Sequence, residues 1–164
     1  SERPAAPSVI DTRNTFIMQS MLRDVIKRGT GRRARTLGRD DLAGKTGTTD
    51  DAADTWFNGF HPDLAATVWV GFPNQEALGT NAYGSNIPLP IWIDFMETAL
   101  AGIEEVPLVQ PPGVVTLKVD PETGNSVAPF DDQGIFEFFL SEHTPDEQTQ
   151  TSSKEEELRA VDLF

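Results

Sequence analysis

The residues best suited to chemistry lie in the stretch 42–49, Leu-Ala-Gly-Lys-Thr-Gly-Thr-Thr, which brings a cation, a glycine and three hydroxyl groups together. Threonine favours extended backbone, and alternate side chains of a strand share one face, so Thr46 and Thr48 would lie on the face opposite Lys45. Gly47, between two threonines, leaves room for a ligand to lie flat against the strand. The stretch therefore predicts a strand that binds an anionic, peptide-like ligand through backbone N–H groups, hydroxyls and the lysine charge.

A second interpretation stays open, because Lys-Thr-Gly alone is too short to be specific. A lysine in a Gly/Thr turn would have the same sequence. The segment 29–38, rich in glycine and arginine, leads directly to this stretch. Its arginines are Arg32, Arg33 and Arg35, with Arg39 just beyond. They are typical of a solvated basic loop; alternatively, they form a funnel that attracts an anionic substrate.

Composition narrows the classes of function. The 164 residues suffice for one domain with a real core, and the formal net charge is −13. Residues 1–50 carry ten Lys or Arg against six Asp or Glu, whereas residues 51–164 carry three against twenty. So acidic a chain is a poor candidate for general nucleic-acid binding. Cysteine is absent, which excludes disulfides and thiolate chemistry.

Neither a metal site nor a membrane span is indicated. His61 and His143 stand far apart, whereas metal ligands usually cluster. No apolar run approaches the roughly 18 residues of a membrane span, and no signal peptide opens the chain.

Two helices are expected around the candidate strand. Apolar residues three and four positions apart predict a helix over 12–28, with an N-cap at Asp11 or Thr12 and a left-handed Gly29 at its end. A second helix is predicted over 91–101, after the prolines that favour a helix start. The expected core-facing residues are Ile17, Met18, Met21, Leu22, Val25 and Ile26 in the first helix, and Trp92, Phe95, Met96, Ala99 and Leu100 in the second.

Three strands are expected at 42–49, 55–60 and 65–72, and their short connections favour an antiparallel meander. The third strand is nearly all apolar, which predicts that both of its faces are covered. Three aromatic residues of this sheet are expected in the core, namely Trp56, Phe57 and Trp69.

The C-terminal part reads as a small β-rich extension. A strand is predicted at 114–120, with a possible partner at 125–129 after a Pro-Glu-Thr-Gly turn, and an apolar patch follows at 135–140. Three regions are expected: a main domain over 1–105, the extension over 106–140, and an acidic tail over 141–164 whose composition is typical of disorder.

Five blocks follow one another along residues 8–102. They are Arg28-Gly29-Thr30-Gly31-Arg32, then Leu42 to Thr49, Trp56 to Phe60, Val68 to Phe72, and Leu89-Pro90-Ile91-Trp92. In this order they resemble the C-terminal part of the transpeptidase domain of class A penicillin-binding proteins, closest to the penicillin-binding protein 1a type. The resemblance implies an α+β fold of the serine β-lactamase and penicillin-binding protein kind, with an antiparallel sheet packed with helices. Residues 113–140 resemble the family's C-terminal extension less specifically.

The family's nucleophile motif is missing from this sequence. The family combines Lys-Thr-Gly with a Ser-x-x-Lys motif and a second serine motif, but no serine here has lysine three places later or asparagine two places later. By resemblance, both motifs would lie upstream, outside this chain. Asp50 is a smaller departure, because relatives often carry asparagine there, and its charge would oppose a carboxylate ligand.

The resemblance implies acyl transfer through a serine ester. The missing serine would attack the D-Ala-D-Ala bond of a peptidoglycan stem peptide, an amine of a neighbouring stem would take the acyl group, and β-lactams would stop at the ester. Lys45 and Thr48 are the implied catalytic residues, through the lysine charge and a backbone oxyanion donor. The implied substrate- and β-lactam-binding set is Lys45, Thr46, Gly47, Thr48 and Thr49, and no metal or organic cofactor is implied.

The implied partners are the upstream half of the same domain, peptidoglycan stem peptides and β-lactams, with no nucleic acid. A single-pass anchor outside this chain would place the protein at the periplasmic face of the bacterial inner membrane, and the longer parent would also be a glycosyltransferase. Two alternatives remain: a related serine β-lactamase or carboxypeptidase, and a non-catalytic binding or scaffold module.

Overall fold

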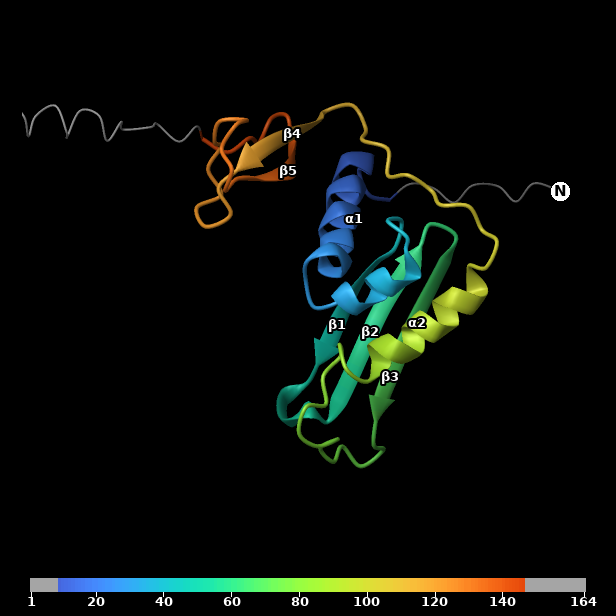
Figure 1. Ribbon diagram of the computed structural model, residues 1–164. Coiled ribbons are helices and arrows are strands. Elements are labelled where there is room, and N and C mark those ends of the chain that lie inside the picture. The colour runs from blue at the N-terminus through green and yellow to red at the C-terminus, as the bar shows by residue number, and fades with distance from the viewer. Residues whose placement is uncertain (1–8, 147–164) are drawn as a thin grey trace, which may run out of the picture. The chain divides into compact units, whose positions relative to one another are not determined.

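The computed structural model describes residues 9–146, and the chain divides after Pro111 into two compact units (Figure 1). The first unit carries the candidate binding strand, and the second carries a β-hairpin. The predicted boundary at residue 105 lies a few residues before this division. Most of the expected tail, 141–164, lies outside the described residues.

A three-stranded antiparallel sheet forms the centre of the first unit. Its strands are β1 (Ala43–Thr48), β2 (Asp54–His61) and β3 (Leu64–Gly71), in the spatial order β1-β2-β3. Connections this short allow consecutive strands to pair only as an antiparallel meander. The predicted meander is confirmed, and each strand end lies within one residue of its expected position.

Helix α1 (Thr12–Lys27) begins where the sequence predicts, because the Asp11 carboxylate caps it by accepting from the N–H of Arg13 at 2.7 Å. Gly29 is not left-handed, contrary to the expectation. Glycine is needed there for a steric reason instead, since a Cβ would lie 2.9 Å from the Cα of Val25.

The segment expected to be a glycine–arginine loop contains a 3₁₀ helix, η1 (Arg32–Leu37), with Ala34 fully buried. Gly38 ends it with φ 65°, a conformation that favours glycine. The arginines therefore project from an ordered element that lies between α1 and β1.

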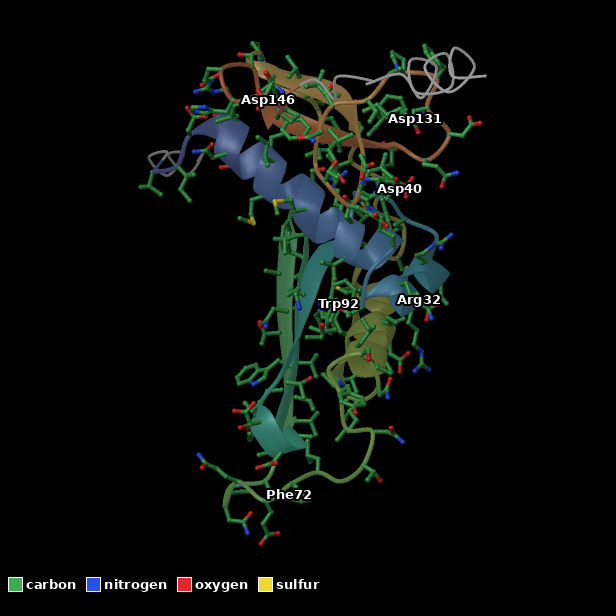
Figure 2. The ribbon with its side chains drawn as sticks, turned by 90° about the vertical axis from the view of Figure 1, so that its left-hand side faces the viewer. Arg32, Asp40, Phe72, Trp92, Asp131 and Asp146 are labelled. Carbon is green, nitrogen blue, oxygen red and sulfur yellow. The ribbon has the colours of Figure 1, made fainter. Side chains whose placement is uncertain are left out.

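Helix α2 (Pro88–Ala99) covers one face of the sheet and starts earlier than predicted, because Pro88 fits the first turn of a helix. Trp92 lies between α2 and the strands (Figure 2), with its ring 4.9 Å from that of Phe57 in an edge-on arrangement. Gly59 leaves the space for it, since a Cβ there would lie 2.6 Å from a Trp92 ring atom. The core cluster comprises Ile26, Ala34, Leu42, Phe57, Leu89, Trp92, Ile93, Met96 and Leu100.

The other face of the sheet is open within the described residues, which corrects two expectations. Strand β3 alternates between exposed and half-buried side chains and is not covered on both faces. Of the three aromatic residues expected in the core only Phe57 is there, because Trp56 is 37% and Trp69 is 46% exposed. The two tryptophan rings lie 6.1 Å apart across the strands. Apolar composition predicted a covering layer, and residues 9–146 do not provide one.

The apolar stripes of the helices are only partly buried. In α1 the buried side chains are Phe16, Arg23 and Ile26, whereas Met18 and Met21 are 55% and 57% exposed. In α2 the expected core residue Phe95 is 48% exposed. The stripes were predicted at the right spacing, but the described residues cover only part of them.

The second unit is a hairpin of β4 (Val114–Val119) and β5 (Ile135–Leu140), which pair antiparallel. The partner strand expected at 125–129 is wrong, because that segment makes only an isolated bridge between Ser126 and Val119. The 135–140 segment pairs instead, since its aromatic and branched residues suit a strand better. The predicted α+β class with a small C-terminal β extension is confirmed.

Candidate functional site

Strand β1 lies at an edge of the sheet, with only β2 beside it in the described part of the chain. The N–H of Thr49 donates to the carbonyl of Asp54 at 3.0 Å, so these residues form a hydrogen-bonded pair. Bonded and non-bonded pairs alternate along an antiparallel ladder, and Thr48 opposite Thr55 comes next. The backbone N–H and C=O groups of Thr48 and Thr46 therefore point to the free edge, where an extended ligand can bind them.

Lys45 is exposed and folds over that free edge. Its Nζ donates to the Thr46 carbonyl at 2.8 Å and lies 3.4 Å from the Thr46 hydroxyl. The first contact agrees with a Thr46 carbonyl that faces away from β2. Within residues 9–146 the ammonium bonds to no serine, and it places a compact positive charge beside the edge.

The two threonine hydroxyls have different partners. Thr46 Oγ1 lies 2.7 Å from Thr30 Oγ1, in the loop after α1. Thr48 Oγ1 accepts a hydrogen bond from the N–H of Gly84 at 3.2 Å. A hydroxyl has one proton to donate, and the Gly84 contact leaves the Thr48 proton free. Thr48 is therefore ready to donate to an anionic ligand.

Thr30 and Gly84 contribute to this site. Sequence analysis named Thr30 only as part of the first family block, without a role in binding, and did not single out Gly84. A Cβ on Gly84 would lie 2.5 Å from the Trp56 carbonyl and 2.8 Å from the Gly47 carbonyl, so only glycine lets this loop contact the strand closely. In the sequence, Gly84 is a glycine and Thr30 lies between two glycines, which marks both as possible turn positions. Glycine alone does not indicate which distant strand such a turn contacts.

Gly47 and Thr49 have structural roles in addition to the predicted ones. A Cβ on Gly47 would lie 3.2 Å from the Cβ of Trp56, so glycine also relieves crowding across the ladder. The Thr49 hydroxyl accepts from the N–H of Asp54 at 2.8 Å and closes the connection from β1 to β2. Asp50 is exposed at the start of the short helix η2 (Asp50–Ala52).

A cavity of about 390 Å³ lies at the C-terminal end of β1. This volume falls within the range of small-molecule sites, roughly 300–1,000 Å³. Thr48 and Thr49 form one wall, and three non-glycine residues with left-handed backbone, Asp51 (φ 57°), Ala52 (φ 52°) and Asn81 (φ 67°), also line it. A ligand bound along the free edge of β1 would thus extend from Thr48 into a preformed space.

A buried polar cluster fixes the other end of β1. The Asp41 carboxylate accepts from Arg39 Nη2 at 2.6 Å, from His61 Nε2 at 3.1 Å and from the N–H of Val106 at 2.9 Å. Arg39 also donates to the carbonyls of Ile103 and Glu104. Arg39 therefore holds the segment after α2 against the start of β1.

The hydrogen bonds of this cluster fix its protonation pattern. The N–H of Asp63 donates to His61 Nδ1 at 3.2 Å, so Nδ1 is an acceptor and Nε2 carries the proton given to Asp41. Burial by itself would raise the pKa of Asp41, but hydrogen bonds from Arg39 and from the Val106 N–H outweigh it and hold that pKa below its usual value. The carboxylate stays charged at neutral pH.

The described part of the chain offers neither a cluster of metal ligands nor a membrane-spanning helix. No group of three or more His, Cys, Asp or Glu residues within 9–146 could hold a metal ion. Among the same residues, no helix has the length and hydrophobicity that a membrane crossing needs.

Several known proteins are similar to this chain in sequence and in fold. Penicillin-binding protein 1A of Pseudomonas aeruginosa is 51% identical over 144 residues, which is 88% of this chain and 18% of that protein. Penicillin-binding protein 1A of Neisseria flavescens is 46% identical over 111 residues, 68% of this chain and 14% of that protein. The 2.6 Å crystal structure of penicillin-binding protein 1A from Haemophilus influenzae superimposes with a TM-score of 0.79 at 33% identity, over 87% of this chain and 22% of that one. No family model matches the sequence.

The chain thus spans less than a quarter of the length of the proteins that it matches. Sequence identity and superposition agree over nearly the whole of this chain, and the matched segment includes the edge strand with Lys45 and Thr48. On this evidence the chain belongs to the penicillin-binding protein 1A family.

Proposed function

We propose that this chain supplies the Lys-Thr-Gly strand of a peptidoglycan D,D-transpeptidase, which cross-links stem peptides by acyl transfer through a serine ester and is acylated by β-lactams. Its similarity to penicillin-binding proteins 1A supports a role in peptidoglycan synthesis. The transpeptidase proposal rests on Thr48. Its backbone N–H points to the free edge of β1, and its hydroxyl has a proton available to donate. One residue can thereby bind both the oxyanion and the carboxylate of an acyl-transfer substrate.

The remaining site residues complete this assignment. Lys45 contributes positive potential beside the edge. By the family resemblance, it would also hydrogen-bond to a serine supplied from the upstream segment. Thr46 contributes a second hydroxyl once its bond to Thr30 rearranges. Gly47 keeps the strand narrow enough for a substrate backbone to lie antiparallel to it. Thr49 supports the turn beside the site and lines the adjoining cavity.

The nucleophile belongs, in this proposal, to the upstream part of a longer protein. The relatives are several times longer than this chain, and the open face of the sheet exposes the large rings of Trp56 and Trp69. We assign the covering of that face to the upstream half of the transpeptidase domain. The same upstream region would carry the Ser-x-x-Lys motif, the glycosyltransferase and the anchor that holds the protein at the periplasmic face of the inner membrane.

Labelling of the intact protein with a fluorescent penicillin tests the proposal. We expect one covalent adduct, which mass spectrometry places on a serine upstream of this chain. Lys45→Ala should slow the labelling about 100-fold or more, because charge stabilisation of the transition state is lost. Lys118→Ala, which removes a lysine from the second unit, is the matched control and should label normally. An intact protein that takes up no penicillin would instead favour a non-catalytic binding or scaffold module.

A further inference from the structure

The cavity of about 390 Å³ beyond Thr48 is bounded by a loop that is anchored at both ends. On one side the N–H of Leu78 donates to the Ala52 carbonyl at 3.0 Å, and on the other the N–H of Gly84 donates to the Thr48 hydroxyl at 3.2 Å. Residues 79–83, between these anchors, all line the cavity. Its shape is therefore set before a ligand binds, which lowers the cost of binding.

Three residues of the cavity wall have an unusual backbone conformation. Asp51, Ala52 and Asn81 have φ values of 57°, 52° and 67°, in the left-handed region. Aspartate and asparagine adopt this conformation more readily than other residues, whereas alanine adopts it at a cost. Backbone that is strained in this way is concentrated at ligand sites.

A single carboxylate gives this cavity its charge. Among the nine described residues that line it, Asp51 alone is charged at neutral pH. Within residues 9–146 its side chain forms no hydrogen bond and no ion pair. The sequence has no Lys or Arg between Lys45 and Lys118, so neither segment of the wall, 48–52 or 79–83, supplies a cation. The cavity therefore has a negative potential, which suits a cationic group.

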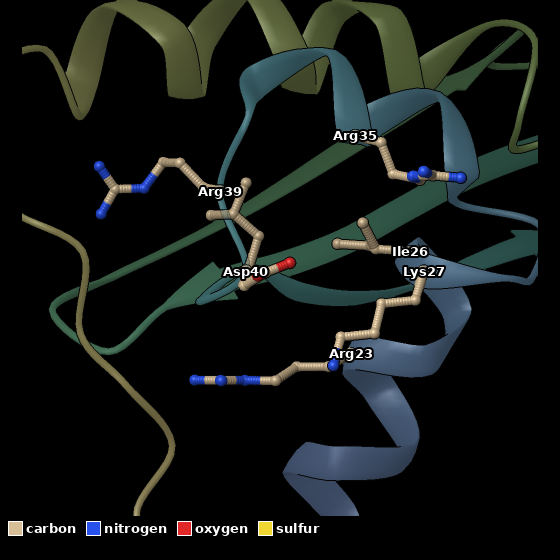
Figure 3. Close-up of a pocket in the computed structure, with 7 residues that line it drawn as sticks. Arg23, Ile26, Lys27, Arg35, Arg39 and Asp40 are labelled. Carbon is tan, nitrogen blue, oxygen red and sulfur yellow. The ribbon is translucent and has the colours of Figure 1, made fainter. Parts of the chain in front are cut away.

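The cavity near the start of β1, of about 220 Å³, has a different character (Figure 3). Basic and acidic residues line it together, among them Arg23, Arg35 and Asp40. The guanidinium groups of Arg23 and Arg35 point to opposite sides in Figure 3, so they do not converge on one ligand position. Of the two cavities, the one beyond Thr48 has the simpler charge and adjoins the edge where a substrate is proposed to lie.

The direction of the bound peptide rests on the proposed function. A substrate that lies antiparallel to β1 has its terminal carboxylate toward Lys45 and its acyl side toward the end of the strand at Thr48. The residue before the scissile bond therefore extends beyond Thr48 into the cavity. In the proposed reaction, stem peptides serve as acyl donors and also, through an amine, as acceptors, so the donor stem carries an amine too. Lys45 and Asp51 match these two groups of the donor in sign.

We propose that the cavity beyond Thr48 binds the ammonium group of the donor stem peptide, with Asp51 as the residue that selects for it. An ammonium group has three protons to donate. The Asp51 carboxylate accepts one of them. Thr80 and Asn81 also line the cavity and have side-chain oxygens that can accept the others.

Three penicillins that differ in their acyl side chain test this selection on the intact protein, because that side chain takes the place of the residue before the scissile bond. The side chain is neutral in benzylpenicillin, carries an ammonium group in ampicillin and carries a carboxylate in carbenicillin. In Asp51→Asn the ratio of the ampicillin to the benzylpenicillin acylation rate should fall about three- to fivefold, as expected for the loss of an exposed ion pair. The ratio for carbenicillin should rise by a similar factor. Higher ionic strength should move the wild-type ratios in the same directions.

Asp50→Asn is the matched control, because Asp50 is an exposed neighbour that does not line the cavity. It should change either ratio by less than about twofold. Asparagine adopts left-handed backbone as aspartate does, so Asp51→Asn should keep the conformation of the wall. Because each ratio compares two rates of the same variant, a general loss of folded protein cancels.

A stem pentapeptide that competes with benzylpenicillin labelling tests the natural ligand. Acetylation of its amine should weaken the competition about three- to fivefold in the wild type and should have little effect in Asp51→Asn. The competition measures binding of the donor, so it does not depend on the acceptor role of the same amine.

The proposal would be overturned by unchanged ratios in Asp51→Asn, by equal changes in Asp50→Asn, or by both ratios moving in the same direction. An acetylated pentapeptide that competes as well as the free amine would also overturn it. Failure of the proposed function would look different, since the wild type would then take up none of the three penicillins, and this inference would fall with it.

Discussion

His61 Nε2 lies 3.1 Å from Asp41 Oδ2, with both side chains fully buried. His61 is the last residue of β2, and Asp41 precedes β1 by two residues. Asp41 also accepts from the N–H of Val106, beyond α2. One carboxylate therefore joins three segments that are far apart in the sequence and fixes where the Lys-Thr-Gly strand begins.

Removal of the histidine should destabilise the protein. In His61→Ala the Asp41 carboxylate stays buried with one donor fewer, and a cavity replaces the ring. We expect the free energy of unfolding to fall by about 1–3 kcal/mol or more, measured by urea denaturation of the intact protein. His143→Ala, at an exposed position, should change it by less than about 0.5 kcal/mol. Equal effects of the two variants would contradict a structural role for the buried cluster.

Stability should depend on pH through Asp41. Because its pKa is lower in the folded state than the ordinary 3.8, the unfolded chain binds the proton more readily. Its contribution to stability is therefore complete above about pH 4, and it is lost as the pH falls through the folded pKa. The difference in unfolding free energy between wild type and Asp41→Asn should be largest near pH 7 and should narrow below pH 4. A difference that stays constant down to pH 3 would show that the Asp41 charge is not stabilising.

Thr48→Val tests the hydroxyl at the free edge of β1. Valine keeps the size and strand preference of threonine, but it removes the proton available to a carboxylate. We expect penicillin acylation of the intact protein to slow about 10- to 100-fold, since a hydrogen bond to a charged group is lost. Thr67→Val, in the same sheet, removes a hydroxyl that bonds only to Asn58 and should leave the rate unchanged. An unchanged rate in Thr48→Val would exclude this hydroxyl from the reaction.

Gly84→Ala tests the loop that contacts Thr48. The new Cβ would lie 2.5 Å from the Trp56 carbonyl, so the loop has to move away and its N–H can no longer reach the Thr48 hydroxyl. We expect slower acylation and a lower melting temperature together. Ser85→Ala, at the next position, serves as the control with little effect on either measurement. Normal acylation in Gly84→Ala would show that the loop does not position Thr48.

Local patterns predicted most of the fold. The Asp11 cap, the two helices and the three strands follow from spacing, capping and strand preference, which act over a few residues. Whether both faces of β3 are covered could not be predicted from such local patterns. A nearly all-apolar strand records which surfaces are buried in the complete protein, and here the open face with Trp56 and Trp69 has no covering layer within residues 9–146.

The candidate site was predictable to the extent that one strand carries it. Lys45, Thr46 and Thr48 are adjacent in the sequence, so strand alternation alone places their side chains. The contacts of Thr30 and Gly84 with that strand depend on how a distant turn and loop fold back on it. The strand predicted to pair with β4 was wrong for a similar reason. Segments 125–129 and 135–140 both lie close enough in the sequence to pair with β4, and only packing selects between them.

The isolated 164-residue chain should form no covalent adduct with a labelled penicillin. Acylation requires a hydroxyl activated by a base within hydrogen-bond reach, and within residues 9–146 the Lys45 ammonium bonds only to Thr46. Thr46 and Thr48 bind the ligand in the proposed mechanism and do not attack it. Addition of the upstream polypeptide that carries Ser-x-x-Lys should restore labelling, with mass spectrometry placing the adduct on that polypeptide. An adduct on any residue of this chain would contradict the roles assigned to Lys45 and Thr48.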